Sequence, residues 1–235
     1  MCKVGIYLVC DYLNRDGFLK AVEICNRYKI DFLEIGFPFS DPVADGPVIE
    51  KAALDVLKRE NTGDFFKSLK SAREIFKGRL YVMTYANVIF GYGSEKFAKE
   101  AQMVDGMIIA DLPLTESGRF KRIFDRYNIN LIHFATPESS YEDIDKVKKI
   151  SKDFIYFVST RGITGGSFSL DQETADKINY ARNNFNKDVI LGFGIRSKDD
   201  IHKACKTADG VVIGTEAIRA IEENRFENFI KSLRQ

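Results

Sequence analysis

Short hydrophobic runs alternate with longer amphipathic segments along almost the whole chain. The runs have the length and composition of β-strands, and the segments between them repeat apolar residues at helical spacing, as Phe18, Val22 and Cys25 do after the first run. The pattern therefore predicts a repeated strand–helix unit. The eight predicted strands span residues 4–9, 32–36, 80–85, 106–110, 130–134, 154–159, 188–191 and 210–213.

Eight strands that alternate with helices, with no linker between them, predict an α/β fold whose parallel strands close into a (β/α)8 barrel, the TIM-barrel architecture. The 235 residues suit a single barrel domain spanning 1–235. An open, doubly wound sheet is the main alternative, but no Gly-x-Gly-x-x-Gly follows the first strand, where its dinucleotide site would lie. The residues with potential chemistry follow strands, so a barrel would gather them at its C-terminal face.

The second predicted strand carries a carboxylate in an apolar setting. Both faces of residues 32–36 are largely apolar, so the strand should be buried on both sides, where an ionised Glu34 is costly unless it is compensated. Three of the five prolines follow within ten residues, at 38, 42 and 47, and they stiffen the loop that carries Asp41 and Asp45. A buried acid beside a rigid acidic loop predicts a catalytic site built on Glu34 and Asp45.

Structural roles for these two acids stay open at this point. Glu34 could pair with a neighbouring barrel residue, and Asp45 could be only an N-terminal residue of the helix that begins near Pro47. If both are functional, burial would bring the pKa of Glu34 towards neutrality, as a general acid or base requires. The wetter loop position of Asp45 favours its ionised form.

Three glycine-bearing turns follow the last three predicted strands, at residues 162–166, 192–194 and 214–215. Glycine lets backbone N–H groups approach an anion closely, and a helix N-terminus adds a favourable dipole. Barrels often bind phosphate with the loops after their seventh and eighth strands. The turns therefore predict a phosphate site on the C-terminal face, formed mostly by backbone donors, since Arg161 and Arg196 are the only cations beside them.

Two histidines and a tyrosine are weaker candidates. His133 lies between Ile132 and Phe134, a setting typical of a hydrogen-bonded core histidine, and His202 begins a surface helix pattern. With these two histidines alone, neither a histidine-based triad nor a zinc site is expected. Tyr156 alternates inward along its strand, so its hydroxyl would meet a ligand or a barrel neighbour.

Composition narrows the classes further. A net charge of +1 offers no excess for nucleic acid or an anionic membrane surface. No apolar run approaches membrane-spanning length and no secretory signal precedes the first strand, so we expect a cytoplasmic protein. The cysteines Cys2, Cys10, Cys25 and Cys205 are widely spaced and lack a metal-site pattern, so we expect reduced thiols.

Residues 33–47, Leu-Glu-Ile-Gly-Phe-Pro-Phe-Ser-Asp-Pro-Val-Ala-Asp-Gly-Pro, are similar to the signature of the tryptophan synthase alpha subunit family. This motif is long and specific. Shorter matches follow in the family's order and extend the resemblance over nearly the whole chain. They are Tyr-Ala-Asn at 85–87, Ala-Asp-Leu-Pro at 110–113, Gly-Ile-Thr-Gly at 162–165, Gly-Phe-Gly at 192–194 and Gly-Thr at 214–215.

The resemblance implies a carbon–carbon lyase of tryptophan biosynthesis, which cleaves indole-3-glycerol phosphate to indole and glyceraldehyde 3-phosphate by a retro-aldol reaction. It also implies a partner, the beta subunit, which uses pyridoxal phosphate, in an alpha2beta2 complex. No metal or bound cofactor is expected in this chain. Phe39 on the stiff loop would contact that partner or pack on the barrel rim.

Functional roles carry over by position. Glu34 would be the acid/base catalyst, Asp45 would hold the indole N–H, and Tyr156 would line the site. Thr164, in a lid segment at 160–169, would hydrogen-bond Asp45 when the lid closes. The residues that would bind phosphate are Gly165, Gly194, Gly214 and Thr215.

Four features depart from the family's pattern. The chain begins almost at its first strand, so we expect the family's N-terminal helix to be missing. The loop at residues 10–14 lacks the family's glycine- and proline-bearing turn, and Thr215 stands where serine is usual. Glu216 follows where a small residue is expected; a carboxylate there suits a helix N-terminus but would repel phosphate if it turned inward.

Three other functions stay open as alternatives. Another phosphate-binding barrel enzyme, such as a sugar-phosphate isomerase or a prenyl transferase to glyceryl phosphate, would keep the glycine turns but would not need Glu34 and Asp45 together. A non-catalytic barrel that only regulates a partner has no use for a costly buried Glu34. A stand-alone indole-releasing lyase is barely separated from the subunit by sequence.

Overall fold

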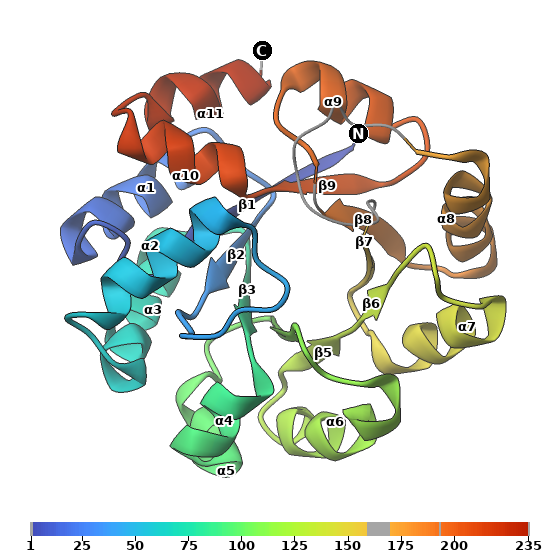
Figure 1. Ribbon diagram of the computed structural model, residues 1–235, viewed down its shortest axis with the longest axis horizontal. Helices are drawn as coiled ribbons and strands as arrows, with labels where there is room; N and C mark the ends of the chain where they lie inside the picture. The colour runs from blue at the N-terminus through green and yellow to red at the C-terminus, as the bar shows by residue number, and fades with distance from the viewer. Residues whose placement is uncertain (1, 159–169, 193, 235) are drawn as a thin grey trace.

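The computed structural model describes residues 2–158, 170–192 and 194–234. Parallel strands form an almost closed barrel in these residues, and helices surround it (Figure 1). The sheet order is β5-β4-β3-β2-β1-β9-β8-β7-β6, so the first and last strands of the chain lie side by side. The strands are β1 (Lys3–Val9), β2 (Phe32–Gly36), β3 (Arg79–Thr84), β4 (Gly106–Ile109), β5 (Asn130–Ile132), β6 (Phe134–Ala135), β7 (Phe154–Val158), β8 (Asp188–Gly192) and β9 (Gly210–Ile213).

Helices follow the strands as the hydrophobic periodicity predicts, and side-chain caps start several of them. Asn61, Ser140 and Ser197 each form a capping box with an aspartate three residues later. The short α4 was not predicted. The helices are α1 (Arg15–Arg27), α2 (Pro47–Leu57), α3 (Thr62–Ile75), α4 (Ala86–Tyr92), α5 (Ser94–Glu100), the 3₁₀ turn η1 (Leu114–Glu116), α6 (Ser117–Asp125), α7 (Tyr141–Ile150), α8 (Gln172–Asn184), α9 (Lys198–Ala204), α10 (Thr215–Glu222) and α11 (Phe226–Arg234).

The predicted barrel is confirmed, but its fifth strand is broken in two. β5 pairs with β4, and β6 pairs with β7, with His133 between them. The His133 N–H donates to the Ser151 hydroxyl at 2.9 Å, so the backbone leaves the ladder at that residue. The eight predicted strands are therefore nine in the described residues, because one strand changes neighbour along its length.

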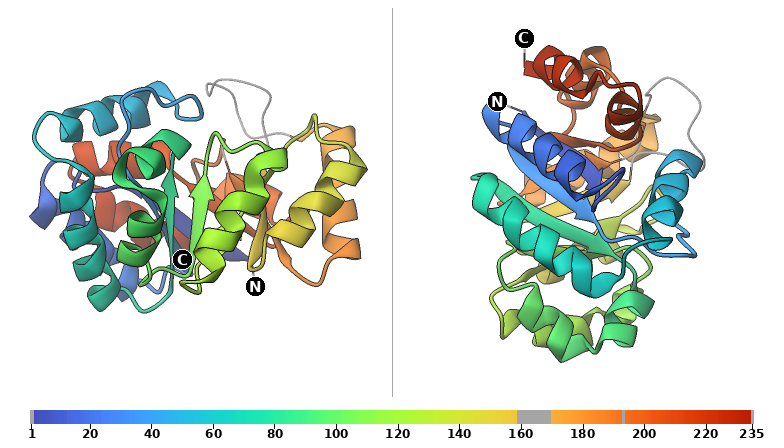
Figure 2. Two further views of the ribbon diagram at one scale, coloured as in Figure 1. Left: turned by 90° about the horizontal axis from the view of Figure 1, so that it is seen from below. Right: turned by 90° about the vertical axis from the view of Figure 1, so that its left-hand side faces the viewer.

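Aromatic side chains fill the barrel below the second strand's carboxylate. Phe32, two residues before Glu34, packs against Tyr81 and Phe154 with ring centroids 5.8 and 5.9 Å away, and Tyr81 and Phe154 meet edge to face at 5.2 Å. This cluster closes the barrel beneath Glu34. The two termini lie at that end, opposite α2 (Figure 2).

A second aromatic cluster holds the loop that leaves β2. Phe37 contacts the rings of Phe65 and Phe66 on α3 and of Phe97 on α5, at centroid distances of 5.6, 5.2 and 5.9 Å. Phe37 is 3% exposed, so this anchor is buried. Packing therefore fixes the start of the loop, in addition to its prolines.

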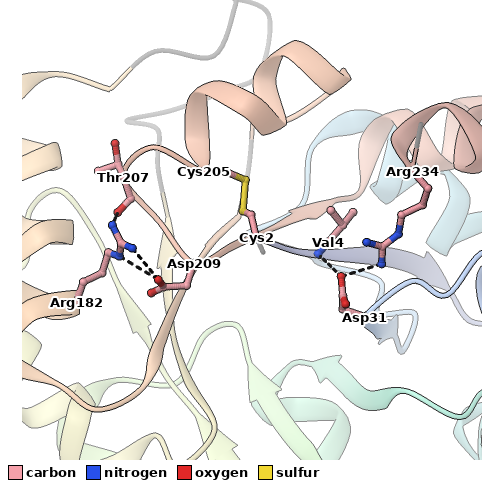
Figure 3. The surroundings of a disulfide bond; sticks show 8 residues. All are labelled: Cys2, Val4, Asp31, Arg182, Cys205, Thr207, Asp209 and Arg234. Carbon is pink, nitrogen blue, oxygen red and sulfur yellow. Dashed lines mark hydrogen bonds and ion pairs between the residues drawn. A yellow bond between two sulfur atoms is a disulfide. The ribbon is translucent and has the colours of Figure 1, made fainter.

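The expectation of four reduced thiols is wrong for one pair. Cys2 and Cys205 form a disulfide with a Cα–Cα distance of 5.8 Å (Figure 3). Cys10 and Cys25 are free and buried. Barrel closure explains the pairing: Lys3 of β1 lies beside Gly210 of β9, which brings the start of the chain to the end of α9. A separation of 203 residues carries no spacing signal.

Ion pairs hold the same end of the barrel. Asp31, just before β2, accepts hydrogen bonds from the Val4 N–H and from Arg234 of α11, both at 2.8 Å (Figure 3). Arg182 of α8 donates to Asp209 at 2.9 Å. In the parts of the chain that the structure describes, no helix is long and apolar enough to cross a membrane.

Candidate active site

Glu34 is the middle residue of β2 and lies inside the barrel. It is 1% exposed, and its neighbours in register are Tyr7 on β1 and Tyr81 on β3. Burial raises the pKa of Glu34 from its ordinary value to about 8, the Tyr156 hydroxyl lowers that pKa by hydrogen bonding, and the charge of Asp45 raises it. One carboxyl oxygen, Oε2, has no hydrogen-bond partner among the described residues. Such a group exchanges protons near neutral pH.

Asp45 lies in the loop between β2 and α2 and is half-buried. Its Oδ2 accepts a hydrogen bond of 2.8 Å from the Tyr85 hydroxyl, which itself accepts one of 3.2 Å from the Ala44 N–H. Burial raises the pKa of Asp45, the Tyr85 hydrogen bond lowers it, and the charge of Glu50 raises it. Gly46 is the N-cap of α2, with proline at the first helical position, so Asp45 does not cap the helix.

Two tyrosine rings, Tyr7 on β1 and Tyr156 on β7, reach towards the acids, and each occupies space that a glycine leaves. A Cβ on Gly192 would lie 2.1 Å from Cε1 of Tyr156, and a Cβ on Gly36 would lie 1.9 Å from the Tyr7 hydroxyl oxygen. Any larger residue at either position would displace the ring. Gly192 therefore serves ring packing as well as the predicted turn.

One cavity brings together most of the predicted residues. Glu34, Asp45 and Tyr156 line it together with Gly214 and Thr215. The cavity measures about 50 Å³, which holds a few water molecules, so binding of a larger ligand must widen it. The sequence reasoning did not predict its other lining residues, which are Tyr7, Ile49, Met83 and Val212.

The sequence reasoning missed Tyr7 and Tyr85, although a sequence pattern points to each of them. Tyr7 faces the barrel interior by period-two alternation along β1, as Tyr156 does along β7. Tyr85 follows β3 directly, within one of the motifs that resemble the family. What the sequence could not show is the direction of each hydroxyl.

Only some residues of the predicted phosphate site lie in the part of the chain that the structure describes. Gly214 is the N-cap of α10 and no side chain caps that helix, so its first N–H groups are available to an anion. Gly194 has φ of +80°, a conformation that favours glycine, and follows β8. Gly194 is not among the residues that line the cavity. Thr164 and Gly165 lie outside the described residues.

Glu216, in the first turn of α10, is paired with two cations. Its carboxylate accepts a hydrogen bond from Arg225 and lies 3.8 Å from Arg219. These ion pairs neutralise the charge that would otherwise repel phosphate at the start of α10. The unusual residue at this position is therefore compatible with anion binding.

The two histidines stand as the sequence predicted. His133 is buried, its Nδ1 lies 3.2 Å from the Phe134 carbonyl oxygen, and burial lowers its pKa, so the ring is neutral. His202 is exposed on α9. Across the described ranges, no group of three or more His, Cys, Asp or Glu side chains has an arrangement suited to a metal ion. The carboxyl groups of Glu34 and Asp45 give the cavity groups that can transfer protons.

The family model described as "Tryptophan synthase alpha chain" matches residues 6–234. A tryptophan synthase alpha chain from Christiangramia forsetii is 34% identical over 98% of this chain and 93% of its own length. The alpha subunit from Campylobacter jejuni superposes with a TM-score of 0.86 at 30% identity, covering 99% of this chain and 95% of that one. A structure of the Pyrococcus furiosus tryptophan synthase α2β2 complex gives 0.90 at 26% identity, covering 99% of both chains. The chain therefore belongs to the tryptophan synthase alpha chain family.

Proposed function

We propose that this chain cleaves indole-3-glycerol phosphate to indole and glyceraldehyde 3-phosphate, with Glu34 as the acid/base catalyst and Asp45 as the residue that holds the indole N–H. The observation that carries the assignment is the contrast between two neighbouring carboxyl groups. Glu34 is buried with a pKa of about 8, whereas Asp45 is half-buried in the loop and hydrogen-bonded by Tyr85. Two acids in different environments can take different roles in one reaction.

The reaction needs one proton delivered and one removed. Protonated Glu34 gives its proton to C3 of the indole ring, and positive charge develops on the ring nitrogen, where ionised Asp45 stabilises it. The Glu34 carboxylate then takes the proton of the hydroxyl next to the breaking bond. The oxygen's electron pair forms the aldehyde, the electrons of the C–C bond return to the ring, and Glu34 ends as it began.

The phosphate of the substrate would lie at the start of α10. The uncapped first turn and the Thr215 hydroxyl supply donors, and Gly214 leaves room for the anion. Gly194 and, by resemblance, Gly165 would complete the site. Thr164 would bond Asp45 on closure, as the resemblance implies. No metal or cofactor of this chain is needed for any step.

A beta subunit is the proposed partner, in an α2β2 complex. Tyr85 connects two residues of the loop after β2, one at the rim and one proposed to be catalytic. Phe39 is half-buried and stacks on the Tyr85 ring at a centroid distance of 5.0 Å, and the Tyr85 hydroxyl donates a hydrogen bond to Asp45. Val43 is 79% exposed on the same loop, and Leu54 is exposed on α2. These apolar groups suit a contact surface through which a partner would act on Asp45. The substrate's phosphate ester does not cross membranes unaided, which supports a cytoplasmic location.

The test is indole release from the purified chain, with and without a beta subunit. We expect slow release from the chain alone and acceleration by the partner. Glu34→Gln should lower turnover by about 10²–10⁴-fold or more because it removes proton transfer but keeps shape. Glu74→Gln makes the same glutamate-to-glutamine exchange at an exposed position on α3, and it controls for the general effect of that exchange. Near-normal turnover of Glu34→Gln would refute the role of Glu34.

A further inference from the structure

Tyr7 is a buried tyrosine whose hydroxyl sits beside both catalytic acids. It is 7% exposed and lies next to Glu34 in the β1–β2 register. Gly36, at the carboxyl end of β2, leaves the space that the hydroxyl occupies, since a Cβ there would lie 1.9 Å from that oxygen. The Tyr7 hydroxyl is therefore placed one inward-facing position above Glu34.

The other end of the Tyr7 side chain lies at the phosphate end. A Cβ on Gly214 would lie 3.5 Å from the Tyr7 Cβ and 3.6 Å from its Cδ1. The side chain thus spans the wall of the cavity from the start of α10 to the acids. A substrate with its phosphate at α10 and its ring at Asp45 must run its three-carbon chain along this wall.

The Tyr7 hydroxyl is neutral and remains available as a donor. Burial first, and then the charges of Asp45 and Glu34, raise its pKa well above the ordinary value. Tyr85, Tyr81 and Tyr12 each donate to a carboxylate, whereas the Tyr7 hydroxyl has no hydrogen bond to any described residue. Tyr7 lines the cavity, so its hydroxyl can donate a hydrogen bond to a ligand that enters there.

We propose that Tyr7 is a specificity residue, which recognises the glyceryl chain of the substrate by hydrogen-bonding one of its two hydroxyl groups. This rests on the proposed function. A site that offers a buried polar partner to a substrate hydroxyl discriminates against an analogue that lacks it. Tyr7 would thus select hydroxylated three-carbon chains over saturated ones, while the phosphate end and the ring pocket bind both alike.

The test compares two ligands on the parent chain and on Tyr7→Phe, which keeps the ring and removes only the hydroxyl. The ligands are indole-3-glycerol phosphate, bound to the Glu34→Gln background so that it is not consumed, and 3-(indol-3-yl)propyl phosphate, which lacks the hydroxyls. We expect Tyr7→Phe to weaken the first by about tenfold and the second by less than twofold in calorimetry. In the Glu34-containing enzyme, kcat/KM should fall by a similar factor. Tyr81→Phe, whose hydroxyl faces Asp153, should change neither affinity.

Each contrary result is informative. Equal weakening of both ligands, or of neither, overturns the proposal. The proposal is also overturned if Tyr7→Phe lowers kcat/KM only by shifting its pH dependence. Tyr7 would then change the pKa of a neighbouring carboxyl group and would not bind the substrate hydroxyl. If the parent releases no indole but Tyr7→Phe still weakens only the hydroxylated ligand, the proposed reaction fails and the role of Tyr7 stands. If neither ligand binds the parent, both proposals fail.

Discussion

The hydroxyl of Tyr85 donates a 2.8 Å hydrogen bond to the carboxylate of Asp45, although forty residues separate them in the chain. The same ring stacks on Phe39 at the barrel rim. One side chain therefore links the carboxyl group proposed to hold the indole N–H to the surface proposed for partner contact. Movement of the loop after β2 would change the position and the pKa of Asp45 together.

Removal of the Tyr85 hydroxyl should impair catalysis more than folding. The hydrogen bond lowers the pKa of Asp45 against the effect of burial, so Tyr85→Phe should raise that pKa and leave less of the ionised form. We expect kcat to fall by about tenfold with a smaller change in KM, as judged by steady-state indole release. Tyr127→Phe, far from the cavity on the loop after α6, is the matched control. A loss equal to that of the control would remove Tyr85 from the mechanism.

The rate should depend on the protonation of Glu34. A carboxyl group with a pKa of about 8 is mostly protonated at pH 7. In the proposed reaction, this proton is the one given to C3. We expect kcat/KM to fall above about pH 8 with the loss of one proton. Tyr156→Phe removes a hydrogen bond that lowers this pKa, so the fall should move to higher pH. A profile that is flat from pH 6 to 10, or a shift to lower pH in the variant, would contradict the assignment.

The same carboxyl group should make stability pH-dependent. The folded state keeps a proton that the unfolded chain releases above about pH 4.5, so this contribution is fully present below that value and declines as pH rises to about 8. The full loss is of order 5 kcal/mol by linkage. Between pH 5 and pH 9, the parent's free energy of unfolding should drop by more than that of Glu34→Gln in urea titrations. Equal drops would mean that Glu34 ionises freely in the folded chain.

The disulfide should contribute substantially to stability. It closes a loop of 203 residues, for which the chain-entropy model predicts about 5 kcal/mol, and measured values commonly reach 2–5 kcal/mol. A reductant should therefore lower the melting temperature of the parent. Cys205→Ser should melt at the lower temperature with or without reductant. Identical melting of the parent in both conditions would show that the bond is absent or adds nothing.

The start of α10 should bind the phosphate. A valine at Gly214 would begin with a Cβ 3.3 Å from Ile49 and extend its methyl groups into the cavity. Gly214→Val should weaken binding of indole-3-glycerol phosphate by tenfold or more, while free indole changes much less. Gly118→Val on α6, where a Cβ would lie 3.8 Å from Nη1 of Arg122, is the control for a glycine-to-valine exchange. Equal losses for both ligands would indicate general disruption.

The sequence by itself determined the barrel and the positions of its two acids. Strand and helix periods differ, so local hydrophobic spacing identifies each element, and the predicted strand 210–213 coincides with β9. Three prolines and an apolar strand are local features, so Glu34 and the stiff loop that carries Asp45 could be recognised without coordinates. The inward direction of Tyr156 could be predicted in the same way, from the period-two alternation of its strand.

Only the tertiary structure decided which groups meet across the barrel. Closure of β1 on β9 joins Cys2 to Cys205. The directions of the side chains bring the Tyr85 hydroxyl within hydrogen-bond distance of Asp45, and the Glu216 carboxylate within hydrogen-bond distance of Arg225. These contacts connect residues from different elements, and their existence depends on shape, burial and rotamer rather than on spacing along the chain. A periodic pattern shows which side of a strand faces the barrel interior. Only the packed barrel shows which residues of other elements that side contacts.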